Sequence, residues 1–373
     1  MFFQDIVGQD EVKERLRRSV TEERISHAQL FSGAEGTGAL ALALAYAQFI
    51  SCSNRSNSDS CGVCPSCKKF AKLVHPDLHF VFPVVKTTKF KEPVSDNFID
   101  KWRELFLKNY YFNLEDWFEK LDVENSQGMI YVYESHEIFR KLNLKSYEGE
   151  FKIMIMWNPE KMNDECANKL LKMIEEPPEK TIFLLVSEKE EEIITTIRSR
   201  CQLIKVPAIR DEDMKKALSS QPEANGKDID NLVHLSNGNY RKALMTLYSE
   251  ADPWNLERFK EIMRLTYSRK FLELFKWVEA VSAAGREAQK SLLLYASRQI
   301  RENFVYNLKN PEFVYMDEQE VEFSKRFSPF INERNVVSIA EELEKAWVHI
   351  SMNGNARIIF TDLALKIVVL IRK

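Results

Sequence analysis

Residues 31–49 read FSGAEGTGALALALAYAQF, an apolar run that enters a glycine-rich turn and continues as a segment rich in Ala and Leu. This order of strand, glycine loop and helix is typical of a phosphate-binding loop, whose working form is G-x-x-x-x-G-K-[ST]. Gly33 and Gly38 occupy the two glycine positions, but Ala39 stands in place of the lysine and Leu40 in place of the hydroxyl residue. The stretch therefore predicts the shape of such a loop without the side chains that bind phosphate and magnesium.

Length and composition indicate a multidomain globular chain. With 373 residues, two or three domains are expected. The 53 Lys and Arg against 56 Asp and Glu give a net charge of -3, which excludes a bulk positive field for nucleic acid. No stretch reaches about 18 consecutive apolar residues, so no membrane span is predicted. The first residues lack the pattern of a signal peptide, and we expect a cytoplasmic location.

Short apolar runs rich in strand formers alternate with helical patterns in the first half of the chain. They fall at 29–32, 78–84, 152–156, 181–186 and 202–206. Nearly continuous apolar strands between helices predict a parallel sheet covered on both faces, and hence an α/β domain over 1–207. Within this domain, 85–127 reads as an insertion, for which we expect a solvated helical elaboration without chemistry. After 207 the strand patterns stop, and we expect a small helical domain over 208–250 and a longer all-α domain over 254–373.

The cysteines indicate a metal site. Four of the six cysteines follow a C-x8-C-x2-C-x2-C pattern, at Cys52, Cys61, Cys64 and Cys67. Four thiolates at this spacing suit tetrahedral zinc, and a site filled by sulfur leaves no position for water, so the expected Zn²⁺ is structural. The alternative is a group of free or redox-active thiols. Cys166 and Cys201 stand alone in the sequence.

Several further motifs occur in a recognisable order. They are VGQ (7–9), the four cysteines, LLKMIEEPP (170–178), SRC (199–201) and NGNYRKAL (237–244). The ordered set resembles the AAA+ clamp-loader subunits of bacterial DNA polymerase III, and within that family the delta-prime subunits. The resemblance implies a P-loop NTPase-like AAA+ domain over 1–207, a helical lid over 208–250 and a helical collar over 254–373 that assembles with other subunits.

The departures from this family concern its ATP chemistry. Active relatives place an Asp-Glu pair after the apolar strand at 152–156, where this chain has Trp157 and Asn158, and the nearest acid is Glu160. The loop also lacks its lysine and its hydroxyl residue. We therefore expect neither ATP hydrolysis nor a nucleotide cofactor. The loop is then a strand-to-helix turn kept for its shape, with degenerate positions Gly33, Gly36, Gly38, Ala39 and Leu40.

Ser199 and Arg200 remain as candidate catalytic residues. The resemblance implies that Arg200 is an arginine finger, a planar cation offered to the ATP of a neighbouring subunit. The alternative is an ordinary surface arginine beside Arg198. Arg241 matches a lid arginine that senses nucleotide in active relatives, and we expect it to be structural here.

The combined prediction is a non-hydrolysing, delta-prime-like clamp-loader subunit with a structural zinc. Its expected partners are loader subunits of gamma/tau and delta type, with primed DNA and the sliding clamp reached through the complex, and no membrane. One alternative is an active AAA+ clamp-loader ATPase, which the altered nucleotide motifs disfavour. The other is a zinc-dependent nucleic-acid-binding protein that uses the four cysteines and Lys68-Lys69-Phe70, which the balanced charge disfavours.

Overall fold

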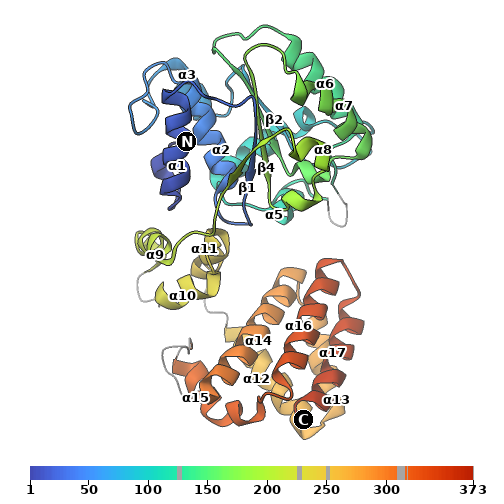
Figure 1. Cartoon of the computed structure of the whole chain (residues 1–373). Coiled ribbons are helices and arrows are strands. Elements are labelled where there is room, and N and C mark those ends of the chain that lie inside the picture. The colour runs from blue at the N-terminus through green and yellow to red at the C-terminus, as the bar shows by residue number, and fades with distance from the viewer. Residues whose placement is uncertain (124–127, 225–228, 249–252, 309–315, 317, 373) are drawn as a thin grey trace. The chain divides into compact units, whose positions relative to one another are not determined.

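The computed structural model describes the chain except for residues 124–127, 225–228, 249–252, 309–315, 317 and 373 (Figure 1). It divides into two compact units, Met1–Tyr248 and Ser249–Lys373. The finer boundary expected at 207/208 lies inside the first unit and stays a prediction. Among the described residues, no helix combines the length and the apolar character that crossing a membrane requires.

A five-stranded parallel sheet forms the centre of the first unit (Figure 1). In spatial order its strands are β2 (Leu78–Val81), β3 (Lys152–Trp157), β4 (Thr181–Ser187), β1 (Ala28–Ser32) and β5 (Gln202–Lys205). Every adjacent pair is parallel. All residues of β3 and β4 are buried, as the continuous apolar runs require of strands covered on both faces. The predicted α/β class with a parallel sheet is confirmed.

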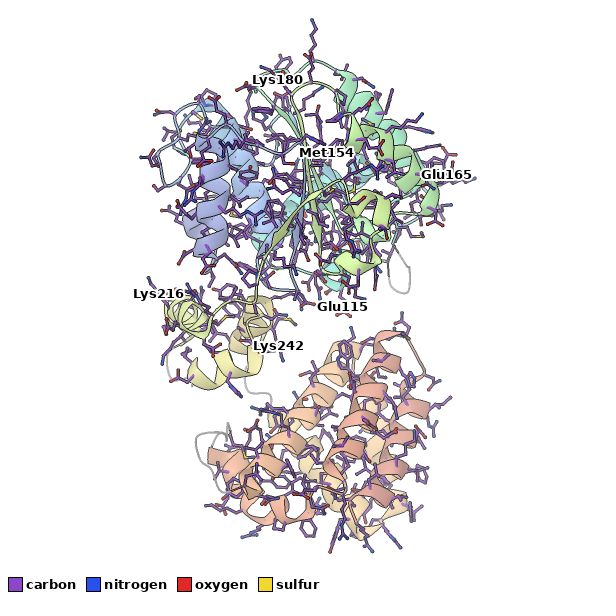
Figure 2. The ribbon with its side chains drawn as sticks, in the orientation of Figure 1. Glu115, Met154, Glu165, Lys180, Lys216 and Lys242 are labelled. Carbon is purple, nitrogen blue, oxygen red and sulfur yellow. The ribbon has the colours of Figure 1, made fainter. Side chains whose placement is uncertain are left out.

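Two layers of helices cover the sheet (Figure 1). The helices α1 (Asp10–Thr21) and α2 (Ala39–Ser51) lie over one face, and α6 (Val132–Asn143), α7 (Asp164–Glu175) and α8 (Thr195–Arg198) lie over the other. Alternate residues of β3 enter the two cores: Ile153 and Ile155 pack with α2, whereas Met154 packs with α6 and α7. Met154 lies in the interior, and Lys180 lies at the periphery (Figure 2).

Local sequence determines where these helices begin and end. Residues 39–50 of α2 are all buried, which explains why the helix is apolar around its whole circumference. The Asn163 side chain caps α7 by accepting a hydrogen bond from the N–H of Cys166. Pro177 follows this helix and cannot extend it. The unit also contains several short helical segments: η1 (Phe3–Asp5), α3 (Pro65–Phe70), η3 (Pro159–Lys161), η4 (Glu190–Glu192) and η5 (Pro222–Ala224).

The insertion is part of the core. It contains η2 (Ser95–Phe98), α4 (Ile99–Lys108) and α5 (Leu114–Lys120). Trp102 and Trp117 are fully buried in it, and Trp102 stacks on Phe82 with ring centroids 4.3 Å apart. The expected solvated elaboration is therefore wrong. The amphipathic pattern of α4 carries aromatic side chains, and these extend the core beyond the end of β2.

The remaining elements are helical. In the first unit, α9 (Asp211–Ser219), α10 (Ile229–Ser236) and α11 (Tyr240–Tyr248) share a small core to which Tyr111 of the insertion contributes. The second unit has one apolar core between its helices. Its elements are α12 (Pro253–Ser268), α13 (Phe271–Ser282), α14 (Arg286–Asn307), α15 (Glu318–Phe327), η7 (Ser328–Phe330), α16 (Val336–Ser351) and α17 (Ala356–Leu370). The predicted change from strands to helices after 207 is confirmed for the described residues.

Candidate functional site

The glycine loop joins β1 to α2. Gly36 and Gly38 have φ angles of +75° and +86°, in the left-handed region that side chains disfavour. A Cβ atom added to Gly36 would lie 1.9 Å from Oδ1 of Asn239, so the neighbouring chain also requires glycine there. Ala39 and Leu40 open α2 and are both buried. The loop thus has the strand-to-helix course of a phosphate-binding loop, with apolar side chains at the lysine and hydroxyl positions.

Aromatic side chains fill the space beside this loop. The remaining cavity measures about 30 Å³ and is lined by the loop together with Tyr110, Tyr111, Phe112 and Trp157. That volume suits one or two water molecules, whereas sites for small organic ligands measure roughly 300–1,000 Å³. The hydroxyl of Tyr111 accepts a hydrogen bond from the N–H of Val7 at 3.0 Å. Tyr110, Tyr111 and Phe112 of the insertion therefore fill most of the space beside the glycine loop.

The last residue of β3 and the residues that follow it are tied into the interior of the unit. Trp157 is 3% exposed, and its ring packs on Phe112 with centroids 5.1 Å apart. Asn158 has a φ of +52°, and its N–H donates to the carbonyl of Val186 at 2.8 Å. The nearby carboxyl of Glu160 accepts a hydrogen bond from Oγ of Ser187 at 2.8 Å, and burial raises its pKa. No pair of carboxylates follows the strand.

A cluster of ionic and amide groups joins the loop, the insertion and α11. Arg241 donates to both carboxylate oxygens of Asp116, from Nε at 2.7 Å and from Nη2 at 2.8 Å. Its Nη1 donates to Glu35 at 3.0 Å, and Asn113 and Asn239 donate to Glu35 at 3.2 and 3.4 Å. The Arg241 side chain is only 12% exposed. Arg241 thus links the loop, the insertion and α11, and its contact with the insertion was not predicted. The expected structural role of Arg241 stays a prediction.

Glu188 reaches the same cavity from the end of β4. Burial, together with the charges of Glu35 and Glu160, raises the pKa of its carboxyl to about 7. At neutral pH the group formed by Glu35, Glu160 and Glu188 therefore carries less negative charge than three ionised carboxylates would carry.

Arg200 lies in the turn between α8 and β5, away from this cavity. It is not among the residues that line the cavity beside the loop. Its Nη1 donates to the carbonyl of Thr196 at 2.8 Å, and its Nε forms an ion pair with Glu175 at the end of α7. The Arg200 side chain is 39% exposed. Ser199 is also exposed, and its hydroxyl donates to the same carbonyl at 3.2 Å. Arg200 thus presents a partly free guanidinium to solvent.

The four clustered cysteines come together at the end of α2 and the start of α3. Their ligand atoms all lie within 4.8 Å of one another. The N–H groups of Cys61, Cys64 and Cys67 donate to the sulfurs of Cys52, Cys61 and Cys64 at 3.3, 3.3 and 3.4 Å. Four sulfurs about 2.3 Å from a central ion fit this spacing, so the donor set suits a tetrahedral metal with no open position. Cys166 and Cys201 lie elsewhere: Cys166 is buried in the core beneath α7, and Cys201 packs against that core.

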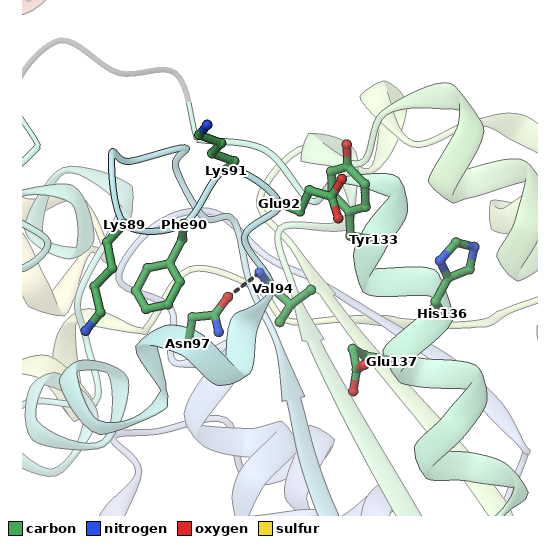
Figure 3. A pocket seen from close by; sticks show the side chains of 9 residues that line it. All are labelled: Lys89, Phe90, Lys91, Glu92, Val94, Asn97, Tyr133, His136 and Glu137. Atoms are coloured by element: carbon green, nitrogen blue, oxygen red, sulfur yellow. Dashed lines mark hydrogen bonds between the residues drawn. The ribbon is translucent and has the colours of Figure 1, made fainter.

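A larger hollow of about 440 Å³ lies beyond the edge strand β2 (Figure 3). No residue of the predicted sites lines it. Both charge signs are present among its lining residues, which are Lys89, Phe90, Lys91, Glu92, Val94, Asn97, Tyr133, His136 and Glu137.

Comparison with known families identifies the chain. A family model described as DNA polymerase III, delta subunit, matches residues 8–210, which is more than half of the sequence. The chain belongs to this family. The match covers the loop, the cysteine cluster, the insertion and Arg200, so the elements described above lie within the family's own region.

Relatives of two kinds are similar to this delta-prime-like chain. The delta' subunit of DNA polymerase III from Bacillus subtilis is 28% identical over 213 residues, covering 57% of this chain and 52% of that protein. The delta' subunit from Yersinia pestis is 28% identical over 175 residues, covering 47% and 40%. The gamma/tau subunit from Mycobacterium bovis is 27% identical over 232 residues, covering 62% and 33%. The chain spans about half the length, or less, of these relatives. The predicted clamp-loader family is confirmed.

The Tyr110–Phe112 segment and Asp116 were missed by sequence reasoning. The run YYF at 110–112 is an unusual aromatic cluster in a polar context, and it could have indicated a buried contact. Asp116 carries no comparable signal, because its partner Arg241 is 125 residues away.

Proposed function

We propose that this chain is a non-hydrolysing, delta-prime-type subunit of the DNA polymerase III clamp loader. The observation that carries the proposal is the filled space beside the glycine loop. Tyr111, Phe112 and Trp157 leave about 30 Å³ there, which is far too little for a nucleotide. Ala39 and Leu40 supply neither the cation nor the hydroxyl that phosphate and magnesium require.

Arg200 supports an active role for the chain in a neighbour's ATPase site. The ion pair with Glu175 engages Nε, and the carbonyl of Thr196 engages one Nη1 hydrogen. The Nη2 hydrogens then remain for an anion on another subunit. A guanidinium in this setting can stabilise the charge that spreads over a transferred phosphoryl group. The exposed turn after α8 is compatible with contact in trans, and Ser199 helps to shape that turn.

The remaining features fit an assembly component. The four cysteines would hold a structural zinc that orders the connection between α2 and α3. The helical second unit would provide the collar through which gamma/tau-type and delta-type subunits associate. Primed DNA and the sliding clamp would then be reached through the complex. The filled pocket weighs against the alternative of an active ATPase, and nothing in the geometry favours a separate nucleic-acid-binding function for the cysteine cluster.

The test is ATP turnover by a reconstituted clamp loader that contains Arg200→Ala. We expect kcat at the site that Arg200 faces to fall by about 10³-fold. The affinity for ATP should change little, because the finger acts mainly on the transition state. Arg200→Lys should not restore turnover, since lysine lacks the planar fork.

Arg198→Ala is the matched control, because Arg198 is an exposed arginine two residues away. It should leave turnover unchanged. Wild-type turnover with Arg200→Ala, measured in a complex that still contains the variant subunit, would contradict the proposal.

A further inference from the structure

The space beside the glycine loop is filled by another segment of the same chain. Residues 110–116 come from the insertion. They contact the loop with aromatic rings and with the side-chain amide of Asn113, and the carboxylate of Asp116 binds Arg241 beside the loop. We infer that this segment is a built-in ligand of the loop: its rings fill the nucleotide space, and Asp116 gives Arg241 the anion that a phosphate would otherwise supply. The inference deepens the proposed function and rests on it for the reading of the loop as vestigial.

The contacts of Arg241 are the first evidence that Asp116 takes the place of a phosphate. Its guanidinium binds Glu35 of the loop and both oxygens of Asp116, so three segments far apart in sequence meet at one side chain. A bidentate carboxylate offers a guanidinium the same planar pair of acceptors that phosphate oxygens offer. Arg241 is only 12% exposed, and such a buried cation needs an anionic partner at all times.

The surrounding contacts show that the segment fixes α11 to the loop. The N–H of Tyr240 donates to the carbonyl of Gly36 at 3.1 Å. The rings of Tyr111 and Tyr240 meet edge to face with centroids 4.9 Å apart. Asn239 lies directly against Gly36 and leaves no room for a side chain there. The start of α11 is therefore held by backbone, aromatic and ionic contacts at once.

A ligand that is part of the chain is always present at high effective concentration. It stabilises the state to which it binds, as a bound molecule does, but independently of any solute. In this chain α9, α10 and α11 should thus keep one position whether or not nucleotide is available.

Hydrogen exchange of the isolated full-length chain tests the inference. Asp116→Asn keeps the size of the side chain but removes its charge, and it places amide hydrogens against Arg241. We expect backbone amides of α11 to exchange at least 10-fold faster in this variant, and those of β3 and β4 to be unchanged. Asp122→Asn is the matched control. Asp122 lies in the same insertion and is 87% exposed, and its ion pair is with Lys101 rather than with the loop.

Arg241→Met removes the other partner of the ion pair with Asp116. It distinguishes the loss of this ion pair from a general weakening of α5, the helix that contains Asp116. It should accelerate exchange of the same helix, and adding Asp116→Asn to it should produce little further change. In Asp116→Ala, inorganic phosphate at millimolar concentration should slow the exchange of α11 again, and it should have no effect on the wild-type chain.

Unchanged exchange in Asp116→Asn, or equal acceleration in Asp122→Asn, would overturn the inference. Failure of phosphate to protect Asp116→Ala would overturn the role of Asp116 as a substitute for phosphate. None of these readouts involves ATP turnover. A failure of the Arg200 test and a failure of this one are therefore distinguishable.

Discussion

Glu134 shows at the scale of one residue how the insertion is attached to the α/β layer. It lies on α6 and is 1% exposed. One oxygen of its carboxyl accepts hydrogen bonds from the N–H and the hydroxyl of Ser95, at 2.6 and 2.9 Å, and the other has no hydrogen-bond partner among the described residues. Burial raises the pKa of Glu134 to about 7, although the bonds from Ser95 act in the opposite direction.

This shift predicts a pH dependence of stability. The unfolded carboxyl loses its proton near pH 4.5, whereas the folded one keeps it to about pH 7. Between these values the folded state binds more protons, so the free energy of unfolding should fall as pH rises, by at most about 3 kcal/mol from this group. Urea unfolding at pH 5, 6, 7 and 8 should show a smaller decrease in Glu134→Gln than in the wild type. Glu137→Gln, on the same helix, is the control and should keep the wild-type slope. Equal slopes in all three chains would refute the assignment.

Single positions differ in how much the sequence reveals about them. Ala39, Leu40, Trp157 and Asn158 could be identified because a motif fixes their spacing along the chain. The packing of Trp157 could not be predicted, because its partner Phe112 comes from a segment whose fold is not apparent from local sequence pattern. The same applies to Arg241, whose position in the lid was expected but whose two acidic partners depend on tertiary structure.

At the scale of elements, the strands and most helices follow from local pattern. The five apolar runs became β1 to β5 with small differences at their ends, and the Asn163 side chain caps α7. The insertion is the clearest failure. Its lysines and acids suggested a solvated surface, but the apolar face of α4 carries Trp102 and Phe106, and both are fully buried. Periodicity indicates that such a helix has a buried face, but it does not say which core receives that face.

The cysteine element makes its own prediction. Cys64 supplies one sulfur to the cluster and also caps α3. Cys64→Ser should remove this sulfur ligand, while the serine hydroxyl can still cap the helix. We expect the purified wild-type chain to contain one zinc per molecule and Cys64→Ser to contain markedly less, as measured by atomic emission. A chelator should lower the melting temperature of the wild type much more than that of the variant.

Cys201→Ser is the control for metal content, because Cys201 lies outside the cluster and should not affect zinc binding. A wild-type chain without zinc, or a Cys64→Ser chain with full zinc, would contradict a four-sulfur site.

At the scale of the whole molecule, the change from an α/β unit to a helical one was predictable because strand patterns stop after 207. The interior of the second unit was less predictable from the sequence. Gln299, Glu302 and Asn303 on α14 are fully buried. Hydrophobic periodicity would assign these polar residues to the surface, so the packing of this helix follows from its neighbours rather than from its own pattern.

The central proposal for the molecule as a whole is that its own side chains fill the space beside the glycine loop where a nucleotide would bind. Titration of Mg-ATP into the isolated full-length chain, followed by calorimetry, tests this claim most directly. The filled cavity of about 30 Å³ predicts no saturable binding at ATP concentrations up to about 1 mM. Saturable binding with a Kd in the micromolar range would contradict it.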